Sequence, residues 1–266
     1  MNRRLTQIGS HLLTKMARKT DIHLYTAQTP NGIKVTMLLE ELGLEYKVTA
    51  IELGKNTQKE PWFLDINPNG RIPAMTDTFT DGSTIRLFES GSIMQYLVDR
   101  YDTGHKVSYP QGSREYYETN NWLFWQMGGL GPMQGQANHF ARYAPEKIEY
   151  GINRYQNETR RLYGVMNTQL GKTNAYLVGD KITIADLSSW GWVAGHHWAG
   201  INIDDFPHLK AWLERVLARP ASEKGRHVPS RHTALEQKNL SQEELDKKAE
   251  QARAWVQQGM AADAKK

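Results

Sequence analysis

The spacing of apolar residues changes from strand-like to helical and back again soon after position 20. Ile22–Tyr25 alternates between apolar and polar residues, and Ile33–Leu42 follows the helical period, with Gly43 as a helix stop. Glu45–Ile51 then alternates once more. These segments predict a βαβ unit, whose two strands should be parallel and joined by a right-handed crossover.

The pattern continues with a second set of elements that completes a small α/β domain. We expect a short helix at Pro61–Leu64, an apolar strand ending near Met75, a hairpin turn at Asp81-Gly82, a strand at Thr84–Leu87 and a helix from 88–92 to Tyr101. The predicted order is therefore βαβ, helix, ββα.

The second half of the chain has the helical period throughout. Helices are predicted at Arg114–Met127, where three glycines and Pro132 then interrupt the pattern, at Lys147–Leu170, and at Phe206–Ala218, which Pro220 ends. We therefore expect an all-α domain to follow the α/β domain.

Two capping boxes mark further helix starts. Thr183 and Asp186 have the spacing at which each side chain satisfies a backbone N–H of the first helical turn, and we assign this pair to stability. Ser241 and Glu244 repeat the spacing and open a charged helix to about Gln258. The predicted division is a basic leader or tail at 1–20, an α/β domain at 21–103, a linker at 104–112, an all-α domain at 113–232 and a partly helical extension at 233–266.

The amino-acid composition excludes several kinds of site and partner. The chain has no cysteine, so disulfides, thiolate metal ligands and a cysteine nucleophile are excluded, and any thiol must come from a ligand. The net charge of +4 arises in the leader, which holds five basic and no acidic residues. Because the rest is close to neutral, we expect no nucleic-acid partner. No apolar run approaches the roughly 20 residues of a membrane span, so we expect no membrane partner.

The leader at 1–20 has two interpretations. Its basic, acid-free composition fits a mitochondrial-type presequence, and it fits equally well a disordered tail with Met16 as an alternative start. We expect a cytoplasmic protein, with mitochondrial targeting as the alternative.

The first candidate for chemistry is the turn Tyr25–Gly32, which joins the first strand to the first helix. A loop of this kind points backbone N–H groups and the positive end of the helix dipole at one spot. That spot favours a bound anion or thiolate. Asn31 also has the alternative role of a helix N-cap, and Tyr25 is expected to pack in the core.

The chain resembles the glutathione transferases over about 22–229. The likeness rests on Asn67-Pro68, Ile72-Pro73, Phe88-Glu89-Ser90 and Thr183-Ile184-Ala185-Asp186. Within that superfamily, Thr29–Gly32, Trp122–Gln126 and Gly128–Met133 resemble the Nu class and the related fungal nitrogen-regulator-like group. The resemblance implies that the α/β domain is thioredoxin-like, that glutathione (GSH or GSSG) is the co-substrate and that the protein is a homodimer.

The resemblance also implies roles for individual residues. Glu89 would bind the amine of the γ-glutamyl end and Ser90 its carboxylate, while the backbone of Ile72, before a cis Pro73, would pair with the cysteinyl main chain. Lys55 and Gln58 would hold the glycine carboxylate. Alternatively, Lys55 and Gln58 are ordinary loop residues exposed to solvent.

The remaining roles concern sulfur and the second substrate. Thr29 and Asn31 would donate hydrogen bonds to the glutathione thiolate and are our catalytic residues. Arg154 would reach the bound glutathione or its second half, with an exposed surface arginine as the alternative. A possible acceptor site consists of Trp125, His139 and Phe140, for which core packing is the alternative.

The resemblance implies a glutathione-dependent transferase and disulfide-bond reductase, which stabilises the thiolate for attack on a small-molecule disulfide or electrophile. The alternative is a glutathione-binding regulatory protein with little turnover. We expect no metal site, because the neighbouring His196 and His197 point to different faces of a helix.

Overall fold

The computed structural model describes residues 19–264, so the predictions for the leader lie almost entirely outside the described residues. The α/β domain contains a four-stranded sheet formed by β1 (His23–Thr26), β2 (Lys47–Ala50), β3 (Ala74–Thr78) and β4 (Thr84–Phe88). The strand order is β2-β1-β3-β4, with β1 and β2 parallel and the other pairs antiparallel. The predicted thioredoxin-like arrangement is confirmed.

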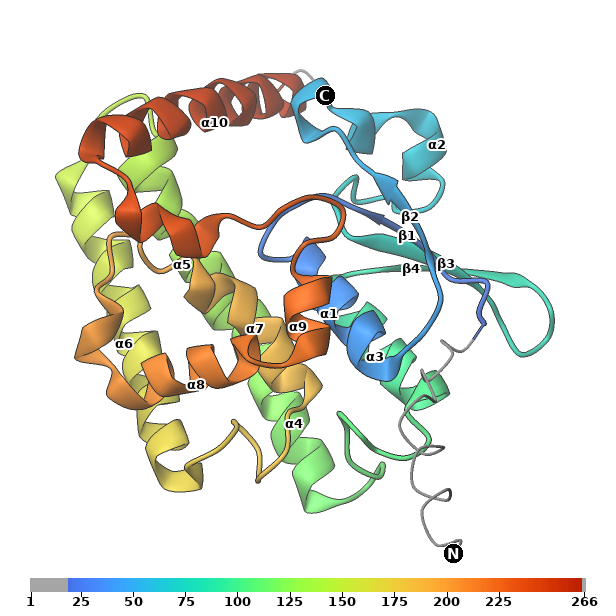
Figure 1. The fold of residues 1–266 in the computed structure, drawn as a ribbon. Helices are drawn as coiled ribbons and strands as arrows, with labels where there is room; N and C mark the ends of the chain where they lie inside the picture. The colour runs from blue at the N-terminus through green and yellow to red at the C-terminus, as the bar shows by residue number, and fades with distance from the viewer. Residues whose placement is uncertain (1–18, 265–266) are drawn as a thin grey trace, which may run out of the picture.

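Helix α1 (Gly32–Leu42) connects β1 to β2 and ends at Gly43, whose φ of 65° closes the helix in the left-handed region. The sequence pattern predicted one buried face, but Lys34, Thr36 and Glu41 are buried as well. The reason is that α1 lies between the sheet and the helices α7 (Ile184–Ala194) and α9 (Pro220–Gly225), as Figure 1 shows.

Helices α2 (Pro61–Leu64) and α3 (Ser90–Tyr101) complete the domain in the predicted order. Two short 3-10 turns, Leu53–Lys55 and Thr57–Lys59, lie between β2 and α2. Ile93, Met94 and Leu97 of α3 are buried, as their spacing predicted.

The helical domain begins with α4 (Arg114–Trp125) and continues through a π-helical segment, η3 (Gln126–Leu130), into α5 (Gly131–Asn138). The predicted interruption of the α-helix at the glycines takes the form of this π-helical segment, and the backbone stays helical through it. The missing Cβ of Gly131 permits this path, since a Cβ would lie 2.9 Å from the Gln126 amide nitrogen. Pro132 is the second residue of α5 and directly follows the π-helical segment.

A second π-helical segment, η4 (His139–Tyr143), precedes the long helix α6 (Glu149–Thr173). The chain then forms α7, a 3-10 turn at Ile203–Asp205 and α8 (Pro207–Leu217). As predicted, α8 ends before Pro220, and Pro220 also opens α9.

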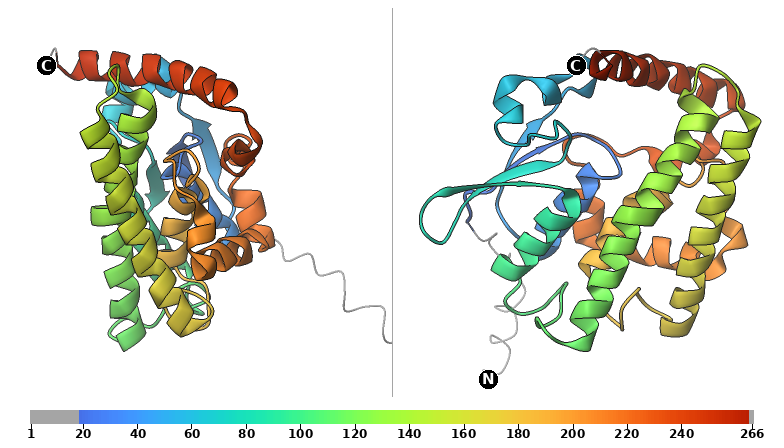
Figure 2. Two further views of the ribbon diagram at one scale, coloured as in Figure 1. Left: turned by 90° about the vertical axis from the view of Figure 1, so that its left-hand side faces the viewer. Right: turned by 180° about the vertical axis from the view of Figure 1, so that it is seen from behind.

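The C-terminal extension forms a 3-10 helix, η6 (Ala234–Asn239), and α10 (Gln242–Asp263), which is longer than predicted. The second capping box is present, because Glu244 accepts from the Ser241 N–H and Ser241 accepts from the Glu244 N–H. Figures 1 and 2 show α10 running along one end of the molecule from the helical domain towards α2. None of the described helices is long and apolar enough to cross a membrane.

One hydrophobic core extends through both domains, from Leu24 and Ile33 in the α/β domain to Trp190 and Trp212 in the helical domain. Across the contact, the Arg219 guanidinium binds both carboxylate oxygens of the buried Glu41, at 2.6 and 2.9 Å. The two domains are therefore held by apolar packing together with a bidentate ion pair, and α1 is fixed on both sides.

Candidate functional site

A cavity of about 140 Å³ lies where the start of α1, the loop before β3 and the start of α3 meet. It brings together five of the predicted site residues, Asn31, Ile72, Pro73, Glu89 and Ser90. Its remaining lining residues are Asn67, Asn69, Arg71 and Met127, which were not assigned a role from the sequence.

The turn before α1 is held by Thr29. Its Oγ1 accepts a hydrogen bond from the Gly32 N–H at 3.0 Å, and its carbonyl accepts from the Ile33 N–H at 3.2 Å. Thr29, and not the side chain of Asn31, therefore caps the helix, although Asn31 occupies the N-cap position. Because Oγ1 is used as an acceptor, the hydroxyl hydrogen of Thr29 is still available to a ligand.

The orientation of the Asn31 amide is set by a residue of the helical domain. The indole Nε1–H of Trp192 donates to Asn31 Oδ1 at 3.1 Å. An indole N–H can only donate, so the carbonyl end of the amide must face Trp192. The NH₂ end of Asn31 is consequently the end that a ligand in the cavity can use, and it can only donate.

The opposite wall carries the residues expected to bind the peptide. The Ile72–Pro73 bond is cis, as expected. The buried Asn67 builds the preceding loop, because it donates to the Arg71 carbonyl at 2.6 Å and accepts from the Asn69 N–H at 2.9 Å. Asn67 thus has a structural role that the motif alone did not reveal.

Glu89 and Ser90 stand at the start of α3. Glu89 is exposed and has φ of 67°, a conformation that is strained for a residue with a side chain. Ser90 is 4% exposed and is the first residue of the helix, where backbone N–H groups have no intrahelical acceptor. The cavity therefore pairs a carboxylate with an anion-binding helix start.

Lys34 lies directly beneath this helix start and was missed from the sequence. Its ammonium donates to Ser90 Oγ at 3.2 Å, to Gln126 Oε1 at 2.7 Å and to Met127 Sδ at 3.6 Å. Burial lowers the pKa of Lys34 to about 7, and the charge of Glu89 opposes this shift. In the sequence Lys34 looks like a solvent-facing position of an amphipathic helix, so no local signal identified it.

Other predicted residues lie outside the cavity lining. Lys55 is exposed and pairs with Glu52 at 2.9 Å. Gln58 is buried, its Nε2 donates to Asn56 Oδ1 at 3.2 Å, and its Oε1 has no partner in the structure. Arg154 lies on an exposed position of α6.

The possible acceptor residues occupy the bent part of the helical domain. Trp125 packs edge-on against Trp122, and Phe140 stacks on Tyr155 with ring centroids 5.4 Å apart. His139 contacts the Phe140 ring. All three predicted residues, Trp125, His139 and Phe140, are half-buried. Their role towards a second substrate stays a prediction.

Tyr25 is half-buried and packs beside Phe63 in a small apolar cluster, which agrees with the expected core packing. Its hydroxyl lies 3.2 Å from His23 Nδ1. Tyr25 does not line the cavity, and neither does the predicted residue Thr29, whereas Asn31 does.

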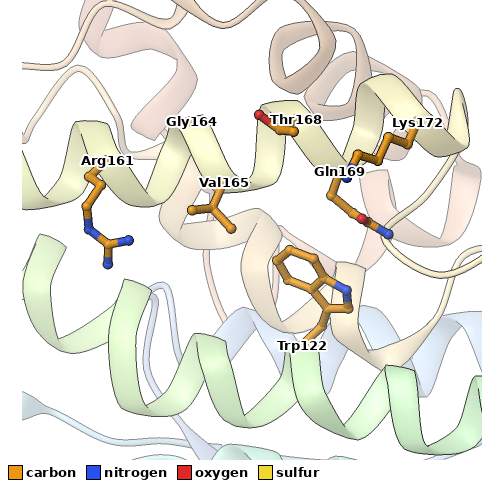
Figure 3. Close-up of a pocket in the computed structure, with 7 residues that line it drawn as sticks. All are labelled: Trp122, Arg161, Gly164, Val165, Thr168, Gln169 and Lys172. Carbon is orange, nitrogen blue, oxygen red and sulfur yellow. The ribbon is translucent and has the colours of Figure 1, made fainter.

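A wider hollow of about 470 Å³ lies between α4 and α6, lined by Trp122 and by residues of α6 such as Arg161 and Lys172 (Figure 3). It contains none of the predicted site residues. In the part of the chain that the structure describes, no group of three or more acidic or histidine residues could hold a metal ion.

Comparison with protein families identifies two regions. Residues 20–99 match the model of the glutathione S-transferase N-terminal domain, and residues 138–220 match that of the C-terminal domain. The matches cover both the strand-rich half that forms the cavity and most of the helical half.

Individual proteins are similar over most of their length. The disulfide-bond oxidoreductase YfcG of Escherichia coli K12 is 45% identical over 203 residues, which cover 76% of this chain and 92% of that protein. A glutathione transferase homolog from Lodderomyces elongisporus, solved with two GSH per subunit, has a TM-score of 0.76 and 47% identity, and covers 79% of this chain and 99% of its own. The transferase URE2P6 from Phanerochaete chrysosporium, solved with oxidized glutathione, has a TM-score of 0.73 and 42% identity, with coverage of 77% and 94%.

Proposed function

We propose that this chain, which belongs to the glutathione S-transferase family, is a glutathione-dependent transferase with disulfide-bond reductase activity. The observation that carries the proposal is the Asn31 amide, whose NH₂ end Trp192 leaves available at the cavity beside Glu89 and Ser90. The absence of cysteine supports the same function, because the thiol must then be borrowed. The relatives described as a disulfide-bond oxidoreductase and as complexes with glutathione add further support.

In the proposed complex the tripeptide lies across the cavity. Its γ-glutamyl amine is bound by the Glu89 carboxylate and its α-carboxylate by the hydroxyl and N–H of Ser90. The backbone of Ile72 pairs with the cysteinyl main chain. Thr29 and Asn31 then donate to the sulfur from the start of α1.

The chemistry of these residues is stabilisation of charge. A cysteine thiol ordinarily has a pKa of about 8.5, and hydrogen-bond donors at a helix start lower it. The thiolate attacks one sulfur of the substrate disulfide, so that a new S–S bond forms, the old one breaks and the leaving thiolate takes up a proton. A second glutathione attacks the mixed disulfide, releasing the other substrate thiol and glutathione disulfide. The protein supplies no nucleophile of its own.

The test compares two reactions of the pure protein with glutathione, reduction of a small mixed disulfide and conjugation of an aryl halide. We expect disulfide reduction to be the faster reaction, and Thr29→Ala and Asn31→Ala each to lower its rate about ten-fold or more. Asn202→Ala is the matched control, because Asn202 caps a 3-10 turn on the surface of the helical domain. Full activity in the Thr29→Ala/Asn31→Ala double variant would contradict the assigned thiol site, and binding without turnover would favour a regulatory role.

We also propose that the protein is a homodimer. Helix α4 exposes Tyr117 by 59% and Phe124 by 65%, at a spacing that puts both rings on one face. Large exposed aromatic residues on one helix face are typical of a surface that another subunit covers. Analytical ultracentrifugation should give a dimer at micromolar concentration, and a monomer would contradict this proposal.

A further inference from the structure

Lys34 is a buried cation with neutral partners. Its side chain is 1% exposed, and its three hydrogen-bond acceptors are the Ser90 hydroxyl, the Gln126 amide oxygen and the Met127 sulfur. Removing an ammonium group from water is expensive unless an opposite charge accompanies it. None of these three acceptors carries a charge, so the structure leaves the Lys34 ammonium without a directly bonded anion in this cluster.

The position of this cluster connects it to the cavity. Ser90 and Met127 line the cavity wall, and Lys34 contacts both from the side facing the interior. Lys34 itself is not a lining residue. An anion bound at Ser90 would therefore be separated from the ammonium by a single hydroxyl group.

We propose that Lys34 is a positioning residue for the γ-glutamyl end of glutathione, holding the Ser90 hydroxyl from beneath and supplying the positive charge that the α-carboxylate requires. Because the Lys34 ammonium donates to Ser90 Oγ, the hydroxyl hydrogen is free to turn towards the ligand. In the structure this hydrogen has Met127 Sδ as its acceptor, at 3.6 Å, and a carboxylate is a much stronger acceptor. The inference rests on the proposed function, since it concerns the same binding site.

The titration behaviour of Lys34 is consistent with this role. Burial lowers the pKa of Lys34 to about 7, so a substantial part of the free protein holds it neutral at slightly alkaline pH. The one charged group that acts appreciably on Lys34 among the described residues is Glu89, which favours the protonated form. A bound carboxylate adds a second negative charge, so binding should draw a proton onto Lys34.

The test measures how strongly the wild-type protein and a Lys34 variant bind three tripeptides. Glutathione is compared with γ-aminobutyryl-cysteinylglycine, which lacks the α-carboxylate, and with glutaryl-cysteinylglycine, which lacks the α-amine. We expect Lys34→Met to weaken calorimetric binding of glutathione and of the glutaryl peptide about ten-fold, and to leave binding of the γ-aminobutyryl peptide unchanged. Lys210→Met is the matched control, because it removes the same charge from α8, where Lys210 pairs with Asp204 at 2.7 Å.

Equal weakening for all three peptides, or for none, would overturn the role of Lys34. Failure of the wild-type protein to bind glutathione would overturn the proposed function instead, so the two failures are distinguishable. A second measurement needs no variant. At about pH 8, wild-type protein should take up a fraction of a proton on binding the S-methyl form of the glutaryl peptide, which has no thiol proton to release and no amine to take one up, and none on binding an S-methyl peptide without the α-carboxylate. Equal proton uptake for both ligands would also overturn the inference.

Discussion

At the scale of single residues, the Asn31 amide owes its orientation to one neighbour. That neighbour is Trp192 of α7, which lies 161 residues after Asn31 in the sequence. The hydrogen bond decides which end of the amide faces the cavity, and therefore whether Asn31 can donate to a sulfur. Activity should thus depend on a residue that touches no substrate.

We expect Trp192→Phe to lower the rate of glutathione-dependent disulfide reduction about five-fold, because the freed amide can rotate. Trp190→Phe is the matched control. The Trp190 indole N–H donates to the Leu213 carbonyl at 3.1 Å, so the same donor is lost from the same helix without touching Asn31. Equal loss of rate in both variants, measured at the same folded fraction, would show that Trp192 acts through stability alone.

Lys34 should also make stability depend on pH. Its pKa is about 7 in the folded protein against an ordinary value of 10.5. Between these values the unfolded chain holds more protons than the folded one, so the free energy of unfolding rises with pH, by at most about 1.4 kcal/mol per pH unit from this group. We therefore expect the free energy of unfolding of the wild type minus that of Lys34→Met, both measured by urea unfolding without ligand, to increase from about pH 7 to pH 10. A difference independent of pH would contradict the lowered pKa.

The sequence predicted those site residues that belong to local motifs and missed those that act across the fold. Asn31, Ile72 and Ser90 lie in short motifs, and all three line the cavity. Trp192 reaches Asn31 only because α7 packs on α1. Lys34 reaches Ser90 and Gln126 only because α1 lies against α3 and η3. The spacing of these residues in the sequence contains no sign of those contacts, so physical reasoning on local patterns could not find them.

At the scale of elements, two helices begin with the same motif in different surroundings. The capping box at the start of α7 is buried, with Asp186 Oδ2 accepting from the Thr183 N–H at 2.9 Å and the Thr183 hydroxyl accepting from the Ala185 N–H at 3.3 Å. Asp186 Oδ1 also accepts from the Trp212 indole at 2.8 Å. The box before α10 is exposed.

We expect Thr183→Ala to lower the free energy of unfolding by about 2 kcal/mol, because it leaves buried polar groups without a partner. Ser241→Ala removes the equivalent hydroxyl at an exposed site and should cost about 0.5 kcal/mol, since water replaces the lost bond. Urea unfolding of both variants measures the difference. Equal costs would show that burial of the motif does not matter.

Element prediction failed where tertiary packing overrides the local pattern. The glycines after α4 indicated a break, but the chain continues as a helix through η3, and Gly131 lets Gln126 and Trp192 approach the backbone closely. The amphipathic pattern of α1 indicated one polar face, which the helical domain then covers.

At the scale of the whole molecule, the two domains depend on contacts around α1. Thr36 donates to the Gly225 carbonyl at 2.7 Å, so α9 lies directly on the helix that begins at the proposed thiol site. A Cβ on Gly225 would lie 2.6 Å from the Met37 Cα, which is too close for real atoms. The fold therefore requires glycine at this contact.

We expect Gly225→Ala to lower the free energy of unfolding by about 1–3 kcal/mol, because the two helices must separate. Gly164→Ala is the control, since Gly164 lies within α6 and a Cβ there meets nothing within 4 Å. That control should be neutral or more stable by up to about 1 kcal/mol, owing to the better helix propensity of alanine. A Gly225→Ala variant as stable as the control would contradict the packing described for α1.

The thiol of bound glutathione offers the sharpest test of the site, because its pKa can be followed through the ultraviolet absorbance of the thiolate. In complex with the wild-type protein we expect this pKa to fall at least about one unit below its ordinary value of about 8.5. In the Thr29→Ala/Asn31→Ala double variant, saturated with glutathione, it should return towards that value. If the thiol bound to the wild-type protein titrates at its ordinary pKa, the start of α1 does not stabilise the thiolate.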